Sequence, residues 1–439
     1  MVRQEDECEQ MIAGPRGMGG LGGAPRRVLY VTHNAPGNVL WGTELNLLDL
    51  IDGLDRERWQ PFAAMVQESG AMEESLRARD IRLLRTRVPR PSRLNAGSVV
   101  AAMRAAEACW RELDGARPDL VHVNHRWAAR TGLLLARRLG VPAVLQLHGR
   151  PKPHHYFTDG AALAEVVVAN SRSTAEAWSW WPARRKVAVV HNGTRLADFR
   201  ANTEERRAVR RELGLSEAEF VIGCVARGTA EKGHLCLIQA LASSGFHEGV
   251  VALLIGVPPV GYRPIADAHV HEIHRLIAGL GVGKRVRLLG FRTDVPRLLN
   301  GLDVVAIPSL QESFGRVAVE AMATSLPVAA TRVGGLPEIV VEGETGLLVP
   351  PGKAAALAQG ISRLRADQGL RLKMGENGRR RAEQHFSMEG HIARMTTVYE
   401  AALRGIVPTA DLLLQTDASR WWLRERGSYA SRFGDYTDA

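Results

Sequence analysis

The chain has 439 residues, of which 45% are hydrophobic and 24% charged, and its formal net charge is +10. The length suits two domains of ordinary size, and the composition is that of a globular protein. No apolar run approaches the roughly 20 residues needed to span a bilayer. No basic run carries interleaved aromatic residues, which disfavours nucleic-acid binding.

Residues 1–26 are acidic and then glycine-rich, and they lack the charged and apolar segments of a signal peptide. We expect them to form a disordered leader, with the fold starting near Arg27. The cysteines show no C-x-x-C spacing, so we expect neither a disulfide framework nor a zinc site, and a reducing cytoplasm is the default location. They are Cys8, Cys109, Cys224 and Cys236.

Strand-like and helix-like segments alternate through the first half of the chain. Short apolar runs that end in turn residues predict buried strands, and runs with an apolar helical face predict helices. The alternation predicts an α/β domain over residues 27–200, with a parallel sheet covered on both faces. Strands are expected in 26–37, 59–70, 118–126, 141–150, 166–170 and 186–193, and helices in 43–54, 98–113 and 128–140. The segment 75–86 is expected to form a helix followed by a strand.

The pattern pauses at 194–217, a polar and charged stretch in which we place the inter-domain linker. The alternation then restarts, which predicts a second doubly wound, Rossmann-like domain over residues 201–385. We expect the segment 386–439 to hold a last helix, which crosses back to the first domain, and a tail. Strands are expected in 220–228, 249–257, 286–291, 303–309, 326–331 and 346–352, and helices in 353–386 and 387–403.

Charged residues gather where predicted strands end, which is where such domains bind ligands, facing across a shared cleft. Arg227 and Lys232 lie on a glycine-containing loop just ahead of a predicted helix. A forked guanidinium, an ammonium and the N–H groups of a helix start can together hold a diphosphate, although a solvated charged turn would look the same.

Two carboxylates, Glu312 and Glu320, stand eight positions apart around a turn that opens another helix. The second has apolar neighbours, so we expect it to be half-buried and to need partners. Their spacing alone leaves open whether they act as acid and base or read hydroxyl groups.

A glycine pair in the second domain, and a glycine and a histidine in the first, also lie where predicted strands end or predicted helices begin. Gly334 and Gly335 let the backbone approach a ligand or a neighbouring segment closely, and a tight turn would explain them equally well. In the first domain, Gly42 opens a helix, and His148 ends a strand, where it either donates to a substrate or packs as an ordinary histidine.

Taken together, the stretches ARGTAEKG, PSLQESFGRVAVEAMA, LPVAATRVGGLPEIVVEGETGLLVPPG, PDLVHVNH, HGR and VVHNG resemble glycosyltransferase family 4. The resemblance runs from about residue 27 to 402. It implies the GT-B fold, in which two Rossmann-like domains face each other across a cleft. It also implies a retaining, metal-independent enzyme that takes a sugar from a nucleotide-diphosphate donor, such as a UDP- or GDP-sugar, without a further cofactor.

The resemblance also assigns roles to individual residues. Arg227 and Lys232 match the basic pair on the donor diphosphate. Glu312 and Glu320 match the E-x7-E motif, whose first member binds hydroxyls of the transferred sugar and whose second binds the ribose. His148 matches a histidine beside that sugar. The remaining donor-binding matches are Gly42 near the phosphates, Phe291 and Arg292 at the base, and Phe314, Gly315, Arg316 and Val317 at sugar and phosphate.

This chain departs from the family pattern at several positions. Trp41 stands where the family has the first glycine of the N-terminal loop, Gly228 follows Arg227 where the family often has Leu, and Ser325 replaces a Gly. The usual Asn-Gly-Val-Asp reads Asn192-Gly193-Thr194-Arg195. None of these changes removes a charged group to which a role is assigned.

The expected activity is transfer to an acceptor hydroxyl on a small molecule, a glycan or a lipid-linked compound, in natural-product or cell-surface glycan biosynthesis. A non-catalytic sugar-nucleotide binder or regulatory subunit is the main alternative. Glycoside hydrolysis by the paired carboxylates is a second one. The basic charge also leaves peripheral association with the inner face of the membrane open.

Overall fold

The computed structural model describes residues 24–408 except 34–39, 67–69, 85, 87–95, 114–115, 150–159, 179–185, 244–245, 247–248 and 258–263. Most of the predicted leader and the tail beyond residue 408 therefore lie outside the described residues. The fold starts at Arg26, one residue before the predicted Arg27. Among the described helices, none combines the length and apolar character needed to cross a membrane.

The first half of the chain forms a seven-stranded sheet in the order β3-β2-β1-β4-β5-β6-β7. All its neighbouring strands pair in parallel. Both faces are buried, which is why these strands read as continuous apolar runs rather than alternating ones. The strands are β1 (Arg26–His33), β2 (Trp59–Val66), β3 (Arg82–Leu83), β4 (Leu120–Val123), β5 (Ala143–Leu147), β6 (Val166–Ala169) and β7 (Val187–Val189).

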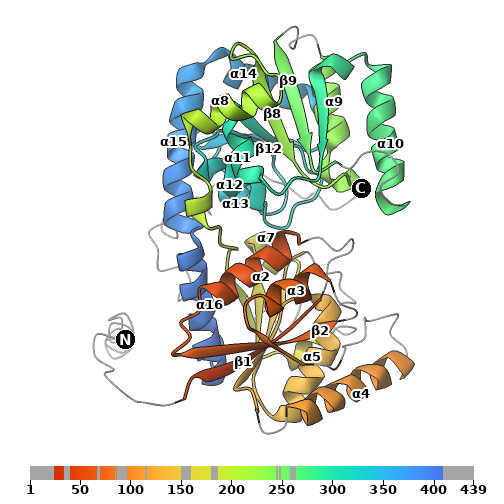
Figure 1. Cartoon of the computed structure of the whole chain (residues 1–439), viewed down its shortest axis with the longest axis vertical. Helices are drawn as coiled ribbons and strands as arrows, with labels where there is room; N and C mark the ends of the chain where they lie inside the picture. The colour runs from red at the N-terminus through yellow and green to blue at the C-terminus, as the bar shows by residue number, and fades with distance from the viewer. Residues whose placement is uncertain are drawn as a thin grey trace.

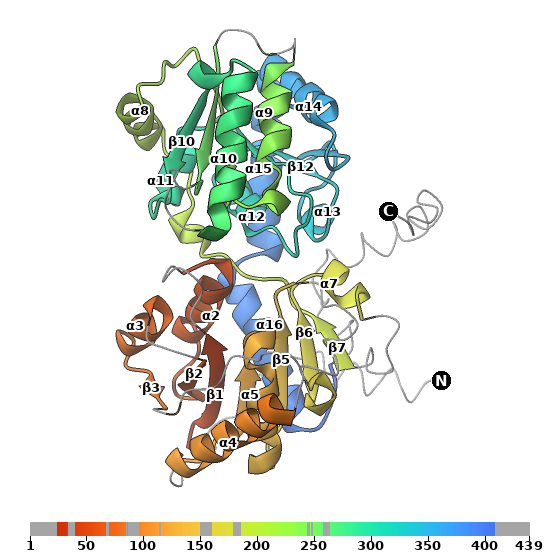
Figure 2. The same cartoon turned by 90° about the vertical axis from the view of Figure 1, so that its right-hand side faces the viewer.

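Helices cover this sheet on both sides (Figures 1 and 2). They are α2 (Gly42–Asp52), α3 (Ala71–Arg77), α4 (Ala96–Glu112), α5 (Arg126–Leu139) and α7 (Arg172–Glu176). The four predicted helices are confirmed, and the predicted segment 75–86 divides into the end of α3 and the short strand β3.

The second half repeats the plan with a six-stranded parallel sheet in the order β10-β9-β8-β11-β12-β13. The strands are β8 (Phe220–Val225), β9 (Val250–Ile255), β10 (Val286–Gly290), β11 (Val304–Ile307), β12 (Val328–Thr331) and β13 (Gly346–Val349). The helices are α8 (Thr203–Glu212), α9 (His234–Ala242), α10 (Pro264–Gly279), α11 (Val295–Asn300), α12 (Arg316–Ala323), α13 (Leu336–Ile339), α14 (Ala354–Ala366) and α15 (Gln368–His385).

The last helix, α16 (Met388–Leu403), returns to the first half, as predicted. Figure 1 shows α15 running down one side of the upper half and α16 continuing into the lower half. The Tyr399 hydroxyl lies 3.2 Å from that of Tyr30 on β1 and 2.5 Å from Nδ1 of His122 on β4. The chain thus crosses between the halves twice, near residue 194 and at residue 387, where the Thr194 N–H donates to the Phe386 carbonyl.

In each sheet, the strand order reverses direction beside the first strand, between β1 and β4 and between β8 and β11. A crevice opens at the carboxyl ends of the strands at such a point, because the crossover helices leave in opposite directions. The predicted linker segment 194–217 contains α8, on which Val209 and Arg210 are buried, so much of this polar stretch packs against the second half. The boundary near residue 200 remains a prediction.

Candidate functional site

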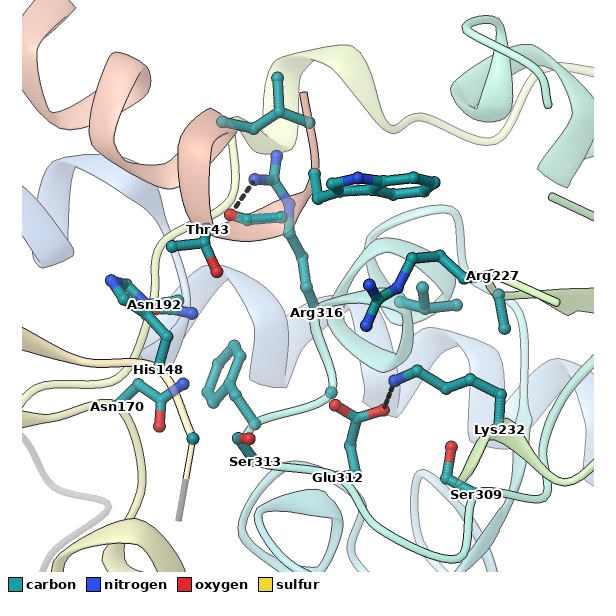
Figure 3. Close-up of a pocket in the computed structure, with 18 of the residues that line it drawn as sticks. Thr43, His148, Asn170, Asn192, Arg227, Lys232, Ser309, Glu312, Ser313 and Arg316 are labelled. Carbon is teal, nitrogen blue, oxygen red and sulfur yellow. Dashed lines mark hydrogen bonds and ion pairs between the residues drawn. The ribbon is translucent and has the colours of Figure 1, made fainter. Parts of the chain in front are cut away.

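A cleft of about 1940 Å³ lies between the two halves and is lined by residues at the carboxyl ends of both sheets. Ordinary ligand pockets measure roughly 300–1,000 Å³, so this cleft has room for two substrates side by side. All twelve predicted site residues line it: Gly42, His148, Arg227, Lys232, Phe291, Arg292, Glu312, Phe314, Gly315, Arg316, Val317 and Glu320. Figure 3 shows several of them.

The centre of the second half's wall is an ion pair between the Lys232 ammonium and the Glu312 carboxylate. Lys232 follows β8, Glu312 follows β11, and their Nζ and Oε2 atoms lie 2.7 Å apart. Both side chains are less than one-fifth exposed. Because β8 and β11 flank the switch point of the sheet, residues 80 positions apart meet at one edge.

Two glycines fix the loops that carry this pair. Gly233, at the start of α9, has a φ of 70°, and a Cβ there would lie 1.9 Å from the Pro308 carbonyl oxygen. Gly334 has a φ of 55°, and a Cβ would lie 1.5 Å from the Glu312 carbonyl oxygen. Only glycine permits both approaches. At Gly334 both a tight turn and a close contact with a neighbouring segment are observed, and the Gly335 N–H donates to the Glu312 carbonyl over 3.1 Å.

Arg227 points into the cleft and is 47% exposed. Its guanidinium lies 3.8 Å from Glu231, a weak pair at this exposure. The guanidinium carbon also lies 5.4 Å from the ring centroid of Trp41, which belongs to the first half. Lys232 and Arg227 therefore approach the same space from one loop. Lys232 is held by a carboxylate of its own half, whereas the aromatic contact of Arg227 comes from the first half.

Glu320 is buried on α12 and is held by Arg316, one helical turn earlier, through Nε and Oε1 atoms 2.8 Å apart. Arg316 also spans the cleft, since its guanidinium lies 3.4 Å from the Gly42 carbonyl and 3.5 Å from the Asp49 carboxylate on α2. The predicted half-buried glutamate with partners is thus buried outright. Its partner connects the two halves.

The side chains of the other predicted residues differ in what they offer to a ligand. Phe314 is 3% exposed, in the core beside Phe386, so its side chain offers little surface to a ligand. The Arg292 guanidinium is held by Asp294 and Glu212, which leaves its backbone for recognition. Phe291, by contrast, is 46% exposed and meets Trp41 edge to face, with ring centroids 5.8 Å apart.

In the first half, His148 directly follows β5 and its Nε2 lies 3.1 Å from Oδ1 of Asn124, which follows β4. Burial, and to a smaller extent the nearby rings of His122 and His33, lower the pKa of His148 to about 3. The imidazole is therefore neutral near pH 7, and this wall contributes it as a hydrogen-bonding group rather than as a charge.

Sequence reasoning missed a second titratable pair on the same wall. His33 ends β1, and its Nε2 lies 3.3 Å from Oε1 of Glu44 on α2. Burial raises the pKa of Glu44 to about 7, although the Trp41 N–H, which donates to its other oxygen over 3.1 Å, favours the ionised form. The sequence signal was the position of Glu44, three residues after the N-cap of a helix, from which a carboxylate can reach back to the N-cap N–H.

Glu338, on α13, was also missed, and it joins the halves on the opposite side of the cleft from Arg316. Its carboxylate accepts from the N–H groups of Arg172 and Ser173 at the start of α7, over 2.9 and 3.0 Å. It also lies 2.7 Å from Nε2 of His191. The motif LPE marked the turn in the sequence, but nothing in it indicated a partner 165 residues away.

Among the described residues, no cluster of three or more His, Cys, Asp or Glu side chains is placed to hold a metal ion.

Comparison with known proteins identifies the fold and the family. Residues 205–381 match the model for glycosyl transferases group 1, and residues 42–198 match that for glycosyltransferase family 4. The crystal structure of Anabaena Alr3699/HepE in complex with UDP superimposes with a TM-score of 0.72 at 27% identity, over 85% of this chain and all of that one.

Curated relatives point the same way. The D-inositol 3-phosphate glycosyltransferase of Salinispora arenicola is 32% identical over 67% of this chain and 71% of its own length. The N-acetyl-alpha-D-glucosaminyl L-malate synthase of Bacillus anthracis is 28% identical over 69% of this chain and 79% of its own length. The predicted resemblance is confirmed: the chain is a glycosyltransferase with two Rossmann-like domains in the GT-B arrangement, and it belongs to glycosyltransferase family 4.

Proposed function

We propose that this enzyme transfers a sugar from a nucleoside-diphosphate donor, with a UDP-hexose as the first candidate, to an acceptor hydroxyl, with retention of anomeric configuration. The observation that carries the proposal is the cation pair at the end of β8, with Lys232 bonded to Glu312 at 2.7 Å and Arg227 beside it. Related structures solved with UDP and with UDP-glucose, at 27% and 26% identity, support the choice of nucleotide.

The two cations stabilise the negative charge of the departing diphosphate. As the bond between the anomeric carbon and the phosphate oxygen breaks, negative charge grows on that oxygen, and donors aimed at it stabilise the transition state more than the ground state. Lys232 has three N–H donors, so it can keep Glu312 and still donate to a phosphate oxygen. Arg227 can contribute a forked contact.

Glu312 and Glu320 lie past the two ends of the diphosphate site and accept from hydroxyl groups. Glu312 would bind the transferred sugar and Glu320 the ribose, because a carboxylate is a poor partner for a phosphate. Arg316 engages one oxygen of Glu320 and leaves the other for a hydroxyl.

Retention follows from attack on the face that the leaving group departs from. The acceptor oxygen forms its bond to the anomeric carbon as the carbon–phosphate-oxygen bond breaks, and the acceptor proton passes to the departing phosphate. The state of two cleft carboxylates supports this route over double displacement. Glu312 is tied to Lys232, and Glu44 is buried against His33 and the Trp41 N–H, which makes each a weak nucleophile.

A donor panel tests the proposal. UDP-, GDP- and dTDP-sugars are compared by thermal shift and by slow hydrolysis, since a ligand that binds the folded state raises its melting temperature. D-inositol 3-phosphate and L-malate, which appear in the names of relatives, come first among acceptors. We expect one UDP-sugar to give both signals and a product whose anomeric NMR coupling matches the donor. An inverted product excludes same-face attack. If no sugar nucleotide in the panel raises the melting temperature or is hydrolysed, the proposed donor class is excluded.

We also propose that transfer needs no metal ion, since Arg227 and Lys232 supply the positive charge at the diphosphate. Turnover should be unchanged after dialysis against EDTA. A loss that Mg²⁺ or Mn²⁺ restores would show that a metal carries part of this charge.

A further inference from the structure

Trp41 meets the second half of the protein at the two places where the nucleotide is expected to bind. Its ring lies edge to face with the half-exposed Phe291, and the guanidinium of Arg227 lies over its face, 5.4 Å from the centroid. These contacts cross the cleft, because Trp41 precedes α2 of the first half and the other two follow β10 and β8 of the second.

Both backbone polar groups of Trp41, its N–H and its carbonyl, are hydrogen-bonded. Its N–H donates to Glu44 over 3.1 Å, and its carbonyl accepts from the Leu45 N–H over 2.9 Å as the first bond of α2. The indole is therefore held by the start of a helix rather than by a freely turning loop.

Arg227 lacks such support from its own half, where its carboxylate partner Glu231 is 3.8 Å away and 40% exposed. A long exposed arginine loses rotamer entropy when it is immobilised. Stacking on an indole face restricts the guanidinium in advance and leaves its N–H groups free at the edge, where they can fork onto phosphate oxygens.

We propose that Trp41 is a positioning residue for Arg227, so that the first half of the protein contributes to binding of the donor's diphosphate. This inference rests on the proposed function, because it takes the diphosphate as the group that Arg227 meets. It gives a role to the residue at which this chain departs from the glycine of its family. Donor binding then depends on contact between the halves, since neither half alone holds both the stacking ring and the cation.

The test is calorimetric titration of UDP into full-length variants. Trp41→Leu keeps much of the bulk and removes the aromatic face, whereas Trp41→Phe keeps a face. We expect Trp41→Leu to weaken UDP binding by roughly threefold to thirtyfold, the range of a cation–π contact, and Trp41→Phe to retain most of the affinity. Trp110→Ala is the matched control, since Trp110 on α4 stacks with Arg138 at 4.1 Å and lies outside the cleft.

A double-mutant cycle decides whether Trp41 acts through Arg227. In the Arg227→Ala background, Trp41→Leu should cause no further loss, because the group it positions is gone. Losses that multiply, or equal affinity of wild type and Trp41→Leu, overturn the inference and leave the proposed function standing. A wild-type protein that binds neither UDP nor GDP overturns both.

Discussion

The two walls of the cleft have the same topology, but the side chains at their strand ends differ in charge: some are ionised in the second half, whereas His148 and Glu44 in the first half are shifted toward their neutral forms. Both are formed where β-strands end beside a reversal of strand order. The second half presents Arg227 and the Lys232–Glu312 ion pair. The first half presents His148, whose pKa is lowered to about 3, and Glu44, whose pKa is raised to about 7.

The cause of this difference is burial. His148 and Glu44 of the first half are buried beside strand ends, which shifts their pKa values toward the neutral forms, whereas Arg227 of the second half stands on a loop and is half exposed to the cleft. The cations of the second half, here called the charged wall, suit a diphosphate, and the neutral forms of His148 and Glu44 in the first half, here called the neutral wall, suit the hydroxyl of an acceptor. The same Rossmann-like plan thus supports two kinds of recognition through the depth at which its strand-end residues lie.

The largest expected effect is on the charged wall. Lys232→Ala should lower kcat at saturating donor by about two orders of magnitude or more, as for a lost oxyanion donor, because it removes a cation and leaves Glu312 unpaired. Lys353→Ala, at the exposed start of α14, is the control. An unchanged kcat for Lys232→Ala would remove the charged wall from the chemical step.

On the neutral wall, Glu44 should make stability depend on pH. Its folded pKa of about 7 exceeds the ordinary 4.5, so the folded state binds the proton more tightly, and stability should fall as pH rises from about 4.5 to 7. The loss for Glu44 alone is up to about 3 kcal/mol. Glu44→Gln should flatten this dependence, as measured by urea unfolding at pH 5 and pH 8. Parallel profiles for the variant and wild type would show that Glu44 is ionised in the fold.

Substitutions of Glu320 and Glu312 test whether one glutamate of the charged wall binds the ribose and the other the transferred sugar. Glu320→Gln should weaken binding of free UDP by about tenfold, the worth of a hydrogen bond to a charged group. Glu312→Gln should mostly spare free UDP and reduce sugar transfer. Each variant is the control for the other, and equal losses of UDP affinity would contradict the division.

The smallest effect is expected for the contact that Glu338 makes between the two halves. Glu338→Gln replaces a carboxylate that accepts from Arg172, Ser173 and His191, and it should lower the free energy of unfolding by about 1 kcal/mol. Glu376→Gln, exposed on α15, should change nothing by comparison. Equal melting temperatures for the two variants would mean that Glu338 does not stabilise the contact between the halves.

The sequence was informative about the fold because parallel strands buried on both faces must be apolar throughout, and they leave a pattern of short runs separated by helices. Each run singled out here became a strand, from β1 to β13. Site residues could be found for a related reason. Strand ends at a switch point are where ligands bind, so charged residues directly after an apolar run, such as Lys232 and Glu312, were natural candidates.

What the sequence determined by itself is therefore the two-sheet architecture, the family and twelve of the residues that line the cleft. Tertiary structure alone decided how those residues pair. Lys232 with Glu312, Arg316 with Asp49, Trp41 with Arg227 and Glu338 with the start of α7 each join segments far apart in the chain. It also decided the protonation of Glu44 and His148. The physical reason is that periodicity reports which side of an element is buried, whereas pairing and pKa depend on which other element packs against it and on how deeply.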